Sequence, residues 1–206
     1  MIDELLASAC RVFTGPSVGW HCDPHAEVQR IYFANHSSHL DFIAIWSALP
    51  PRVRARVRPV AGSDYWSRDP VRRYLAGHVF RALLVDRNSG VAAKAEAARA
   101  SVQRIADGMG AGDSVIVFPE GTRSLDGAMR PFKSGLYHLA RAKPDAELVP
   151  VHLENLNRIL PKGEALVVPM LSRVTFGTPL RTTSDEPKEQ FLARARWAVL
   201  ALRGVA

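Results

Sequence analysis

The feature that most constrains the fold is a short, uninterrupted apolar run at residues 115–118, with polar, glycine or proline residues on both sides. Such a run is typical of a strand buried on both faces, which occurs where helices cover a parallel sheet from both sides. Other strand patterns alternate with helical patterns along the chain. The sequence therefore predicts an α/β fold in which helices flank a mixed, largely parallel central sheet.

Hydrophobic periodicity gives the expected elements. Apolar alternation or apolar runs predict strands at residues 31–34, 53–61, 83–86, 148–153, 165–168 and 173–176. Helical spacing predicts helices at residues 2–13, 40–49, 70–76, 91–108, 134–143 and 187–202. Because Pro59 lacks a backbone donor, we expect its strand to lie near a sheet edge. No linker divides the chain, so we expect residues 1–206 to form a single domain.

The net charge limits the class of partner. A charge of +7 indicates an anionic partner, such as nucleic acid, an acidic membrane face or a phosphorylated substrate. Nucleic acid fits least, because the basic residues are scattered apart from Arg52–Arg58 and no recognised binding motif accompanies them. The two cysteines provide neither a disulfide framework nor a metal cluster.

Two segments predict contact with a membrane from outside. The longest stretch without charged residues, 12–22, is shorter than the about 20 residues that a spanning helix needs. The first six residues lack the basic start of a secretory signal. The amphipathic helix at 2–13 and four alternating arginines favour an anionic lipid surface: Arg52, Arg54, Arg56 and Arg58. We expect a cytoplasmic protein that is peripheral to the membrane, although a core-covering helix and a solvated sheet edge would give the same pattern.

The first candidate site lies between a predicted strand and a predicted apolar helix. His36 and Asp41 are five residues apart, which places them roughly 140° apart on an ideal helix. They can pair only if His36 lies on the entry loop and Asp41 in the first turn. Asp41 then fixes the tautomer of the imidazole, and the second ring nitrogen is free to act as a base. The alternative is that Asp41 or Ser38 merely caps the helix.

The second candidate site directly follows the buried strand. Gly121 allows a ligand to approach the backbone, and Arg123 offers a planar fork of donors to a phosphate or carboxylate. Lys133 precedes a predicted helix, whose N-terminus also favours anions. The alternative is a turn with a solvated arginine. Arg87, at the end of another predicted strand, is a weaker candidate for the same pocket.

These segments resemble the conserved blocks of a known family. Asn35-His36-x-Ser38-x-x-Asp41 is similar to the NHxSxxD form of the HX4D motif of glycerolipid acyltransferases. The seven residues 118–124 match their FPEGTRS block, and Phe132-Lys133-x-Gly135 matches the segment that follows it. Arg87 and the apolar residues 149–151 resemble the second and fourth blocks, in the family's order. The resemblance is closest to the 1-acyl-sn-glycerol-3-phosphate acyltransferases.

The resemblance implies a fold like that of glycerol-3-phosphate acyltransferase and the activity of an O-acyltransferase. It implies transfer of a fatty acyl group from acyl-CoA or acyl-carrier protein to a lysophospholipid hydroxyl, foremost lysophosphatidate, with no other cofactor. By the same analogy His36 is the general base and Asp41 orients it. The remaining matched residues would hold the acceptor phosphate or shape its pocket: Arg87, Arg123 and Lys133 for the phosphate, and Glu120, Gly121 and Thr122 for the pocket. We expect backbone N–H groups near Gly121 and Thr122 to stabilise the tetrahedral intermediate.

Other functions stay open at this point. Residues 60–64 lack a basic residue that family members often carry, so the acceptor could be another lysolipid, such as a lyso-aminolipid. The pattern His36-x-x-His39-x-Asp41 could mark a metal-dependent hydrolase, although the spacing differs from the usual metal-binding pattern. A non-catalytic protein that binds anionic lipid is the third alternative, but it would need neither His36 nor Asp41.

Overall fold

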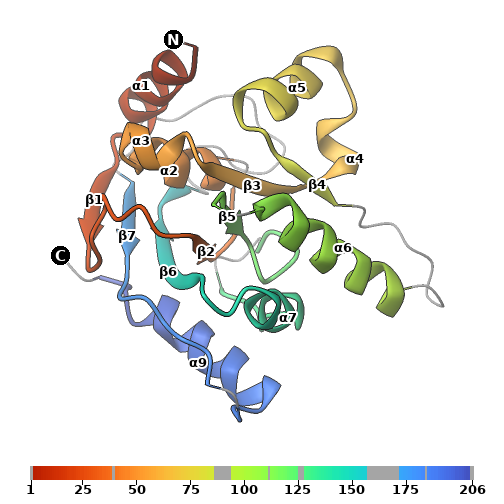
Figure 1. Ribbon diagram of the computed structural model, residues 1–206. Helices are drawn as coiled ribbons and strands as arrows, with labels where there is room; N and C mark the ends of the chain where they lie inside the picture. Colours follow the sequence, from red (N-terminus) through yellow and green to blue (C-terminus); the bar gives the residue numbers. More distant parts are fainter. Residues whose placement is uncertain are drawn as a thin grey trace.

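A seven-stranded sheet lies between two layers of helices (Figure 1). The computed structural model describes residues 2–38, 40–85, 94–110, 112–124, 128–156, 172–183 and 185–204. The strands are β1 (Ser17–Trp20), β2 (Arg30–Ala34), β3 (Val57–Gly62), β4 (Leu83–Val85), β5 (Ser114–Val117), β6 (Glu147–Glu154) and β7 (Arg173–Phe176). Their order across the sheet is β1-β7-β6-β2-β5-β3-β4. The predicted strand at 165–168 lies outside the described residues.

The sheet is mixed and largely parallel, which confirms the predicted fold class. β2 is central and pairs in parallel with β5 on one side and β6 on the other, so that Tyr32 lies opposite both Ile116 and Val149. β3 and β4 extend the parallel part, and β6 pairs antiparallel with β7. Because β2, β5 and β3 run in the same direction, the loops that follow them meet at one edge of the sheet.

The predicted strand at 53–61 is wrong in its first part. Residues Pro51–Arg54 form the short helix α3. Proline is favoured at the first position of a helix, because a backbone N–H there would have no acceptor within the helix. The strand starts at Val57 and lies near a sheet edge, as predicted, beside the edge strand β4. It pairs with β5 through residues 57–59 and with β4 through residues 60–62. Pro59 lies where the pairing changes from one neighbour to the other.

The predicted row of arginines on one strand face does not form either. Arg52 and Arg54 lie on α3 instead of a strand. Arg54 is buried, where it pairs with Glu4 of α1 (Ile2–Thr14) and donates to the Leu49 carbonyl. Arg58 donates to the carbonyl oxygens of Arg81 and Gly108. These two guanidinium groups therefore bind the protein itself.

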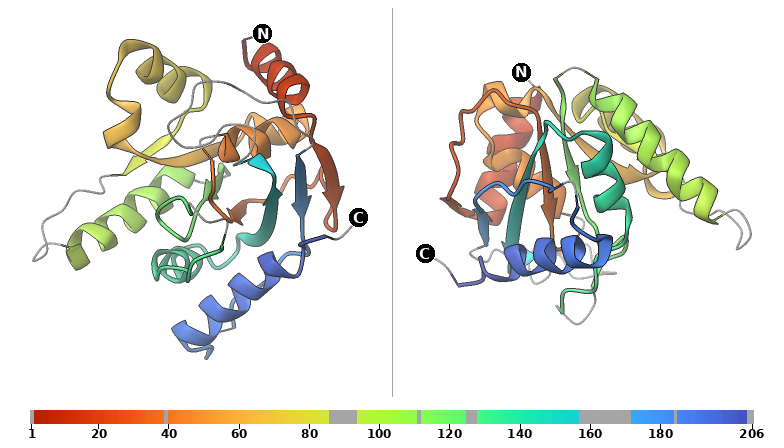
Figure 2. Two further views of the ribbon diagram at one scale, coloured as in Figure 1. Left: turned by 180° about the vertical axis from the view of Figure 1, so that it is seen from behind. Right: turned by 60° about the horizontal axis from the view of Figure 1, so that its bottom comes forward.

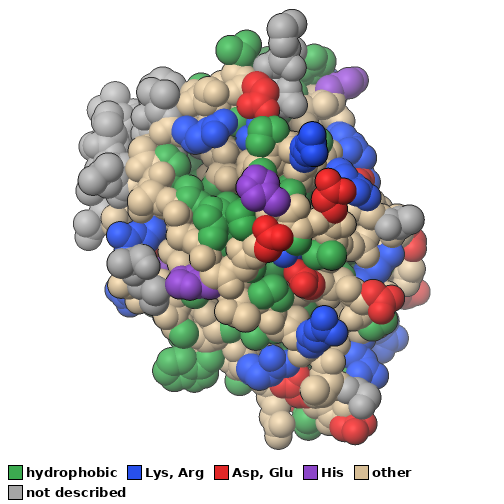
Figure 3. All heavy atoms as spheres, turned by 60° about the vertical axis from the view of Figure 1, so that its left-hand side comes forward, with side chains coloured by type: hydrophobic (Ala, Val, Ile, Leu, Met, Phe, Trp, Pro, Cys, Tyr) green, Lys and Arg blue, Asp and Glu red, His purple; other side chains and the backbone are tan. Residues whose placement is uncertain are grey.

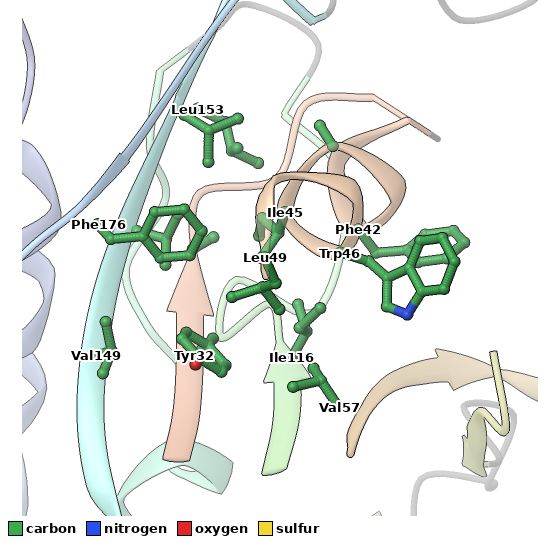
Figure 4. Packing of buried hydrophobic residues seen from close by; sticks show 14 of the residues in the cluster. Tyr32, Phe42, Ile45, Trp46, Leu49, Val57, Ile116, Val149, Leu153 and Phe176 are labelled. Carbon is green, nitrogen blue, oxygen red and sulfur yellow. The ribbon is translucent and has the colours of Figure 1, made fainter. Parts of the chain in front are cut away.

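The helices α1 and α2 (Asp41–Ala48) cover one face of the sheet. Side chains alternate along β2, so that Tyr32 and Ala34 point to this face. Ile45 and Leu49 pack against Tyr32 and its neighbours, as Figure 4 shows. α2 is apolar almost all round because it is buried between the sheet and the outer helices.

The opposite face is covered by the helices α6 (Lys94–Met109), α7 (Gly135–Ala142) and α9 (Lys188–Leu200), which Figure 2 shows from two further sides. Ile31 and Phe33 of β2 point to this layer, where they share a core cluster with Leu139 and Phe191. The helices predicted at 91–108, 134–143 and 187–202 correspond to these elements. None of the helices in the described part of the chain is long and apolar enough to cross a bilayer.

A short helical segment follows the carboxyl end of β3. It comprises α4 (Ser63–Trp66), α5 (Pro70–Tyr74) and the π-helical turn η1 (Leu75–Val79). Asp69 caps α5 by accepting the N–H of Arg72 at 2.9 Å. Trp66 packs edge-on against Phe42 of α2, with ring centroids 5.5 Å apart. The segment is thereby attached beside the start of α2.

Candidate active site

His36 and Asp41 form a hydrogen-bonded pair beyond the carboxyl end of β2. His36 lies on the loop after the strand, and Asp41 is the first residue of α2. His36 Nδ1 lies 2.8 Å from Asp41 Oδ2. Asp41 is fully buried, whereas 14% of the His36 side chain is exposed. A carboxylate only accepts hydrogen bonds, so in the neutral imidazole we assign the proton to Nδ1 and the free lone pair to Nε2.

The backbone of the same loop fixes the carboxylate of Asp41. The N–H groups of Ser37 and Ser38 donate to Oδ2 at 2.6 and 2.8 Å. These N–H groups precede α2, at the end of the helix where a negative charge is favoured. The N-cap of α2 is Leu40 and it has no side-chain capping bond, so the alternative that Asp41 or Ser38 merely caps the helix is wrong.

The ring of His36 is also fixed from one side by Phe118. The two rings are stacked, with centroids 4.2 Å apart and planes inclined by 18°. Phe118 directly follows β5, the strand beside β2. The hydrogen bond to Asp41 and the stacking on Phe118 together limit rotation of the imidazole about both of its side-chain torsions.

Glu120 connects the two candidate segments through the backbone. It is 2% exposed, and its two oxygens accept the N–H groups of His36 at 2.8 Å and Arg130 at 2.9 Å. In return, the N–H of Ser124 donates to the His36 carbonyl at 2.8 Å. Burial raises the pKa of Glu120, while the hydrogen bonds from the two N–H groups act in the opposite direction. The structure therefore places this carboxyl behind the loop, where it holds His36 in position.

Replacing Glu120 with Ala is expected to lower the free energy of unfolding by about 2–4 kcal/mol, because two buried N–H groups lose their acceptor. Urea unfolding followed by circular dichroism measures the change. Glu96→Ala is the matched control, since Glu96 is exposed on α6. Equal stability of the two variants would contradict the role assigned to Glu120.

The loop around Gly121 brings a lysine next to the backbone. Gly121 has φ +71°, a conformation that favours glycine, and its N–H donates to the Phe118 carbonyl at 3.0 Å. A Cβ at this position would come within 2.5 Å of Lys133 Nζ, so the lysine side chain lies over the glycine. The N–H of Lys133 donates to the Pro119 carbonyl at 2.9 Å, which fixes the start of that segment.

The structure describes two of the other predicted ligand-binding residues, Arg123 and Thr122, but not Arg87. Arg123 is half-buried on the loop that bonds to His36, and within the described residues it forms no ion pair. Thr122 is exposed beside it. Arg87 lies outside the described residues. Since the N–H of Gly121 is already bonded to Phe118, it is not a free donor, which corrects the expected oxyanion site at that residue.

Asn35 also contributes to the site, in a role that was not predicted from the sequence. Its side-chain amide donates to the Leu153 carbonyl at 2.9 Å and accepts the Leu153 N–H at 2.8 Å. The amide thus bonds to β6 as a backbone peptide would, and continues the pairing beyond the end of β2. This anchors the loop directly before His36. An amide side chain at the end of a central strand was the available signal.

The alternative metal site was tested on the same residues. Among the residues that the structure describes, no group of three or more His, Cys, Asp or Glu side chains could hold a metal ion. His39 lies outside them.

Comparisons with known proteins agree with this geometry. A family model described as Acyltransferase matches residues 24–154. A 1-acyl-sn-glycerol-3-phosphate acyltransferase of Chlamydomonas reinhardtii is 33% identical over 65% of this chain and 36% of that protein. Proteins of the same name from Limnanthes douglasii and Salmonella typhimurium are each 32% identical, over 77% and 70% of this chain and 52% and 56% of their own length. This chain therefore spans little more than half, or less, of these relatives.

A solved structure shares the fold. The 1-acyl-sn-glycerophosphate (LPA) acyltransferase PlsC from Thermotoga maritima aligns with a TM-score of 0.73 at 18% identity, over 98% of this chain and 77% of that one. The match of the family model covers both loops of the site and more than half of the sequence. This protein belongs to the acyltransferase family.

Proposed function

We propose that this protein is an O-acyltransferase that acylates the free hydroxyl of a lysophospholipid, foremost lysophosphatidate, which becomes phosphatidate. The observation that carries the proposal is the 2.8 Å contact between His36 Nδ1 and Asp41 Oδ2, beside the loop that bears Arg123. The site thus combines an oriented general base with cationic side chains suited to bind a phosphate. The relatives named 1-acyl-sn-glycerol-3-phosphate acyltransferase support lysophosphatidate as the acceptor.

The pair supplies the proton transfer that this reaction needs. An alcohol is a poor nucleophile at neutral pH, so its attack on a thioester requires removal of the hydroxyl proton. Nε2 of His36 accepts that proton while the new C–O bond forms at the thioester carbon. Asp41 stabilises the resulting imidazolium through Nδ1. The tetrahedral intermediate then expels the thiolate, and the imidazolium returns the proton to sulfur.

We assign the acceptor phosphate to Arg123 and Lys133, with Arg87 as a further candidate. Arg123 presents a planar fork, and Lys133 Nζ lies against the backbone at Gly121, where an anion can approach closely. Thr122 is exposed, and its N–H has no partner among the described residues, so this N–H is the candidate donor to the oxyanion.

Replacing Arg123 with Ala is expected to raise the KM for lysophosphatidate about tenfold to a hundredfold with a smaller change in kcat, because a charged contact to the phosphate is lost. Steady-state kinetics at varied acceptor concentration measures both constants. Arg99→Ala is the control, since Arg99 is exposed on α6 and belongs to neither loop of the site. An unchanged KM in the Arg123 variant would remove this residue from the phosphate site.

The acceptor and donor are identified by one experiment. The purified protein is incubated with labelled acyl-CoA or labelled acyl-carrier protein and, in turn, with lysophosphatidate, other lysophospholipids and a lyso-aminolipid. Labelled phosphatidate is the expected product. If a labelled product forms only with the lyso-aminolipid, that lipid is the acceptor in place of lysophosphatidate. If no labelled lipid forms with any acceptor, the proposed function is refuted.

We place the reaction at an anionic membrane surface on the cytoplasmic side, because both substrates carry acyl chains. Basic and acidic side chains are interspersed on the face shown in Figure 3, so that face presents no continuous basic field. The ion pair between Arg54 and Glu4 attaches α1 to α3 beside α2, while Leu5 of α1 is 70% exposed. This supports a role for α1 at the surface, as the sequence predicts.

A further inference from the structure

The segment α5–η1 presents apolar side chains to solvent. Val71 is 67% exposed and Tyr74 is 48% exposed, in contrast to the buried Ala76 and Phe80 on the inner side. Val71, Tyr74 and His78 recur at three- and four-residue spacing, so they share one outward helical face. The rings of Tyr74 and His78 are stacked 4.8 Å apart, which continues the face from α5 into η1. We call Val71, Tyr74 and His78 the docking face.

Arginines surround the docking face. Residues 63–81 contain four arginines and two aspartates. Arg68 and Arg73 are exposed beside the face. Asp69 is neutralised locally, because Arg72 Nε lies 3.0 Å from its carboxylate. Arg72 also lies over the ring of Tyr65 at 4.2 Å. An apolar strip with an aromatic residue and flanking cations is suited to the interface of a bilayer that contains anionic lipid.

The segment that carries the docking face runs from the catalytic edge of the sheet toward the opposite edge. α4 follows β3 at its carboxyl end, the edge that bears the His36 loop, and Trp66 of α4 contacts Phe42. Tyr74 and His78 line a hollow together with Val57, at the amino end of β3. In Figure 1 and in the reversed view of Figure 2, α1 and α5 project toward the same side of the molecule. A bilayer on this side would therefore contact α1 and α5 together.

We propose that the outward face of α5 and η1, formed by Val71, Tyr74 and His78 and flanked by Arg68 and Arg73, docks the protein on an anionic lipid bilayer. The inference rests on the proposed function, since a lipid acceptor must reach His36 from a membrane. It differs from contact through α1 alone, because it adds the exposed arginines Arg68 and Arg73 as contacts to anionic lipid.

The test is flotation of the full chain with vesicles of phosphatidylcholine, with and without phosphatidylglycerol, at low and high salt. We expect the wild-type protein to float with the anionic vesicles in a salt-sensitive manner. The double variant Val71→Asp/Tyr74→Asp should bind at least about tenfold more weakly, because two apolar side chains no longer enter the interface. Arg73→Glu should reduce the dependence on phosphatidylglycerol. Trp197→Asp is the matched control, because Trp197 is 68% exposed on α9, on the opposite side of the molecule.

A second assay separates this inference from the proposed function. With a short-chain, monomeric lysophosphatidate and no vesicles, the double variant should transfer the acyl group at the wild-type rate. Flotation of the double variant equal to that of the wild type overturns the inference, as does loss of binding only in Leu5→Asp. A wild-type dimer that becomes monomeric in the double variant also overturns it, since the face would then join two copies of the chain. Absence of acyl transfer by the wild type refutes the proposed function instead.

Discussion

Replacing His36 with Ala is expected to lower kcat for acyl transfer by about 10²–10⁴-fold, the usual contribution of a general base. The variant lacks the Nε2 atom that accepts the hydroxyl proton, and no other titratable side chain among the described residues hydrogen-bonds to Asp41. The KM values should change little, because the imidazole is assigned to the reacting hydroxyl and not to the phosphate. Initial rates with a labelled thioester and saturating lysophosphatidate measure the effect.

The fold of this variant should survive. Asp41 keeps its bonds from the N–H groups of Ser37 and Ser38, and Glu120 still accepts the N–H of residue 36. His25→Ala is the control, since His25 is exposed in the loop before β2, at the other end of that strand. A His36 variant with wild-type turnover and wild-type thermal stability would contradict the assigned mechanism.

Asp41→Asn is expected to reduce kcat by about 10²–10³-fold, because a neutral amide stabilises the imidazolium less than a carboxylate does. Oδ2 accepts the N–H groups of Ser37 and Ser38 and also contacts Nδ1, so the amide oxygen takes its place and the ring stays oriented. The variant therefore loses the negative charge beside His36 and keeps the hydrogen bond. Measurements of kcat across pH should show a rate below that of the wild type at every pH, since no protonation state of the amide restores the charge.

A stability measurement separates this effect from misfolding. Asp107→Asn is the matched control, because Asp107 is exposed on α6 and bonds to the Gln103 side chain. Thermal unfolding of the Asp41 variant should remain cooperative, with a transition close to that of the control. A folded Asp41→Asn protein that retained wild-type kcat would show that the negative charge of the carboxylate does not stabilise the imidazolium.

Much of the fold followed from periodicity, and the exceptions have physical reasons. β5 and β2 are buried on both faces, so their apolar runs predict strands from the sequence alone. β1 was not predicted because it is an edge strand with half-exposed and exposed side chains and a glycine within it. The first residues of the predicted strand at 53–61 are helical because Pro51 starts a helix whose Arg54 is buried against Glu4 of α1, a contact distant in sequence.

The site, too, was predictable only in part from the sequence. The spacing of His36 and Asp41 indicated that they can pair only across the start of a helix, and the structure has that arrangement. The sequence did not indicate how Glu120 and Asn35 act, because their partners are backbone groups on other segments. Every residue except proline has a backbone N–H, so the sequence does not show which N–H a side chain will bind. These hydrogen bonds can be identified only from the folded structure.

The tautomer of His36 is the most direct test of the central claim, and ¹⁵N nuclear magnetic resonance of the labelled imidazole measures it. In the neutral ring of the wild-type protein we expect the proton on Nδ1, bonded to Asp41, and an unprotonated Nε2. In Asp41→Asn the proton should stay on Nδ1, because the amide oxygen takes the place of Oδ2, which also accepts the N–H groups of Ser37 and Ser38. A wild-type protein whose neutral His36 carries its proton on Nε2 would contradict the account, because that ring could not accept a proton from a lipid alcohol.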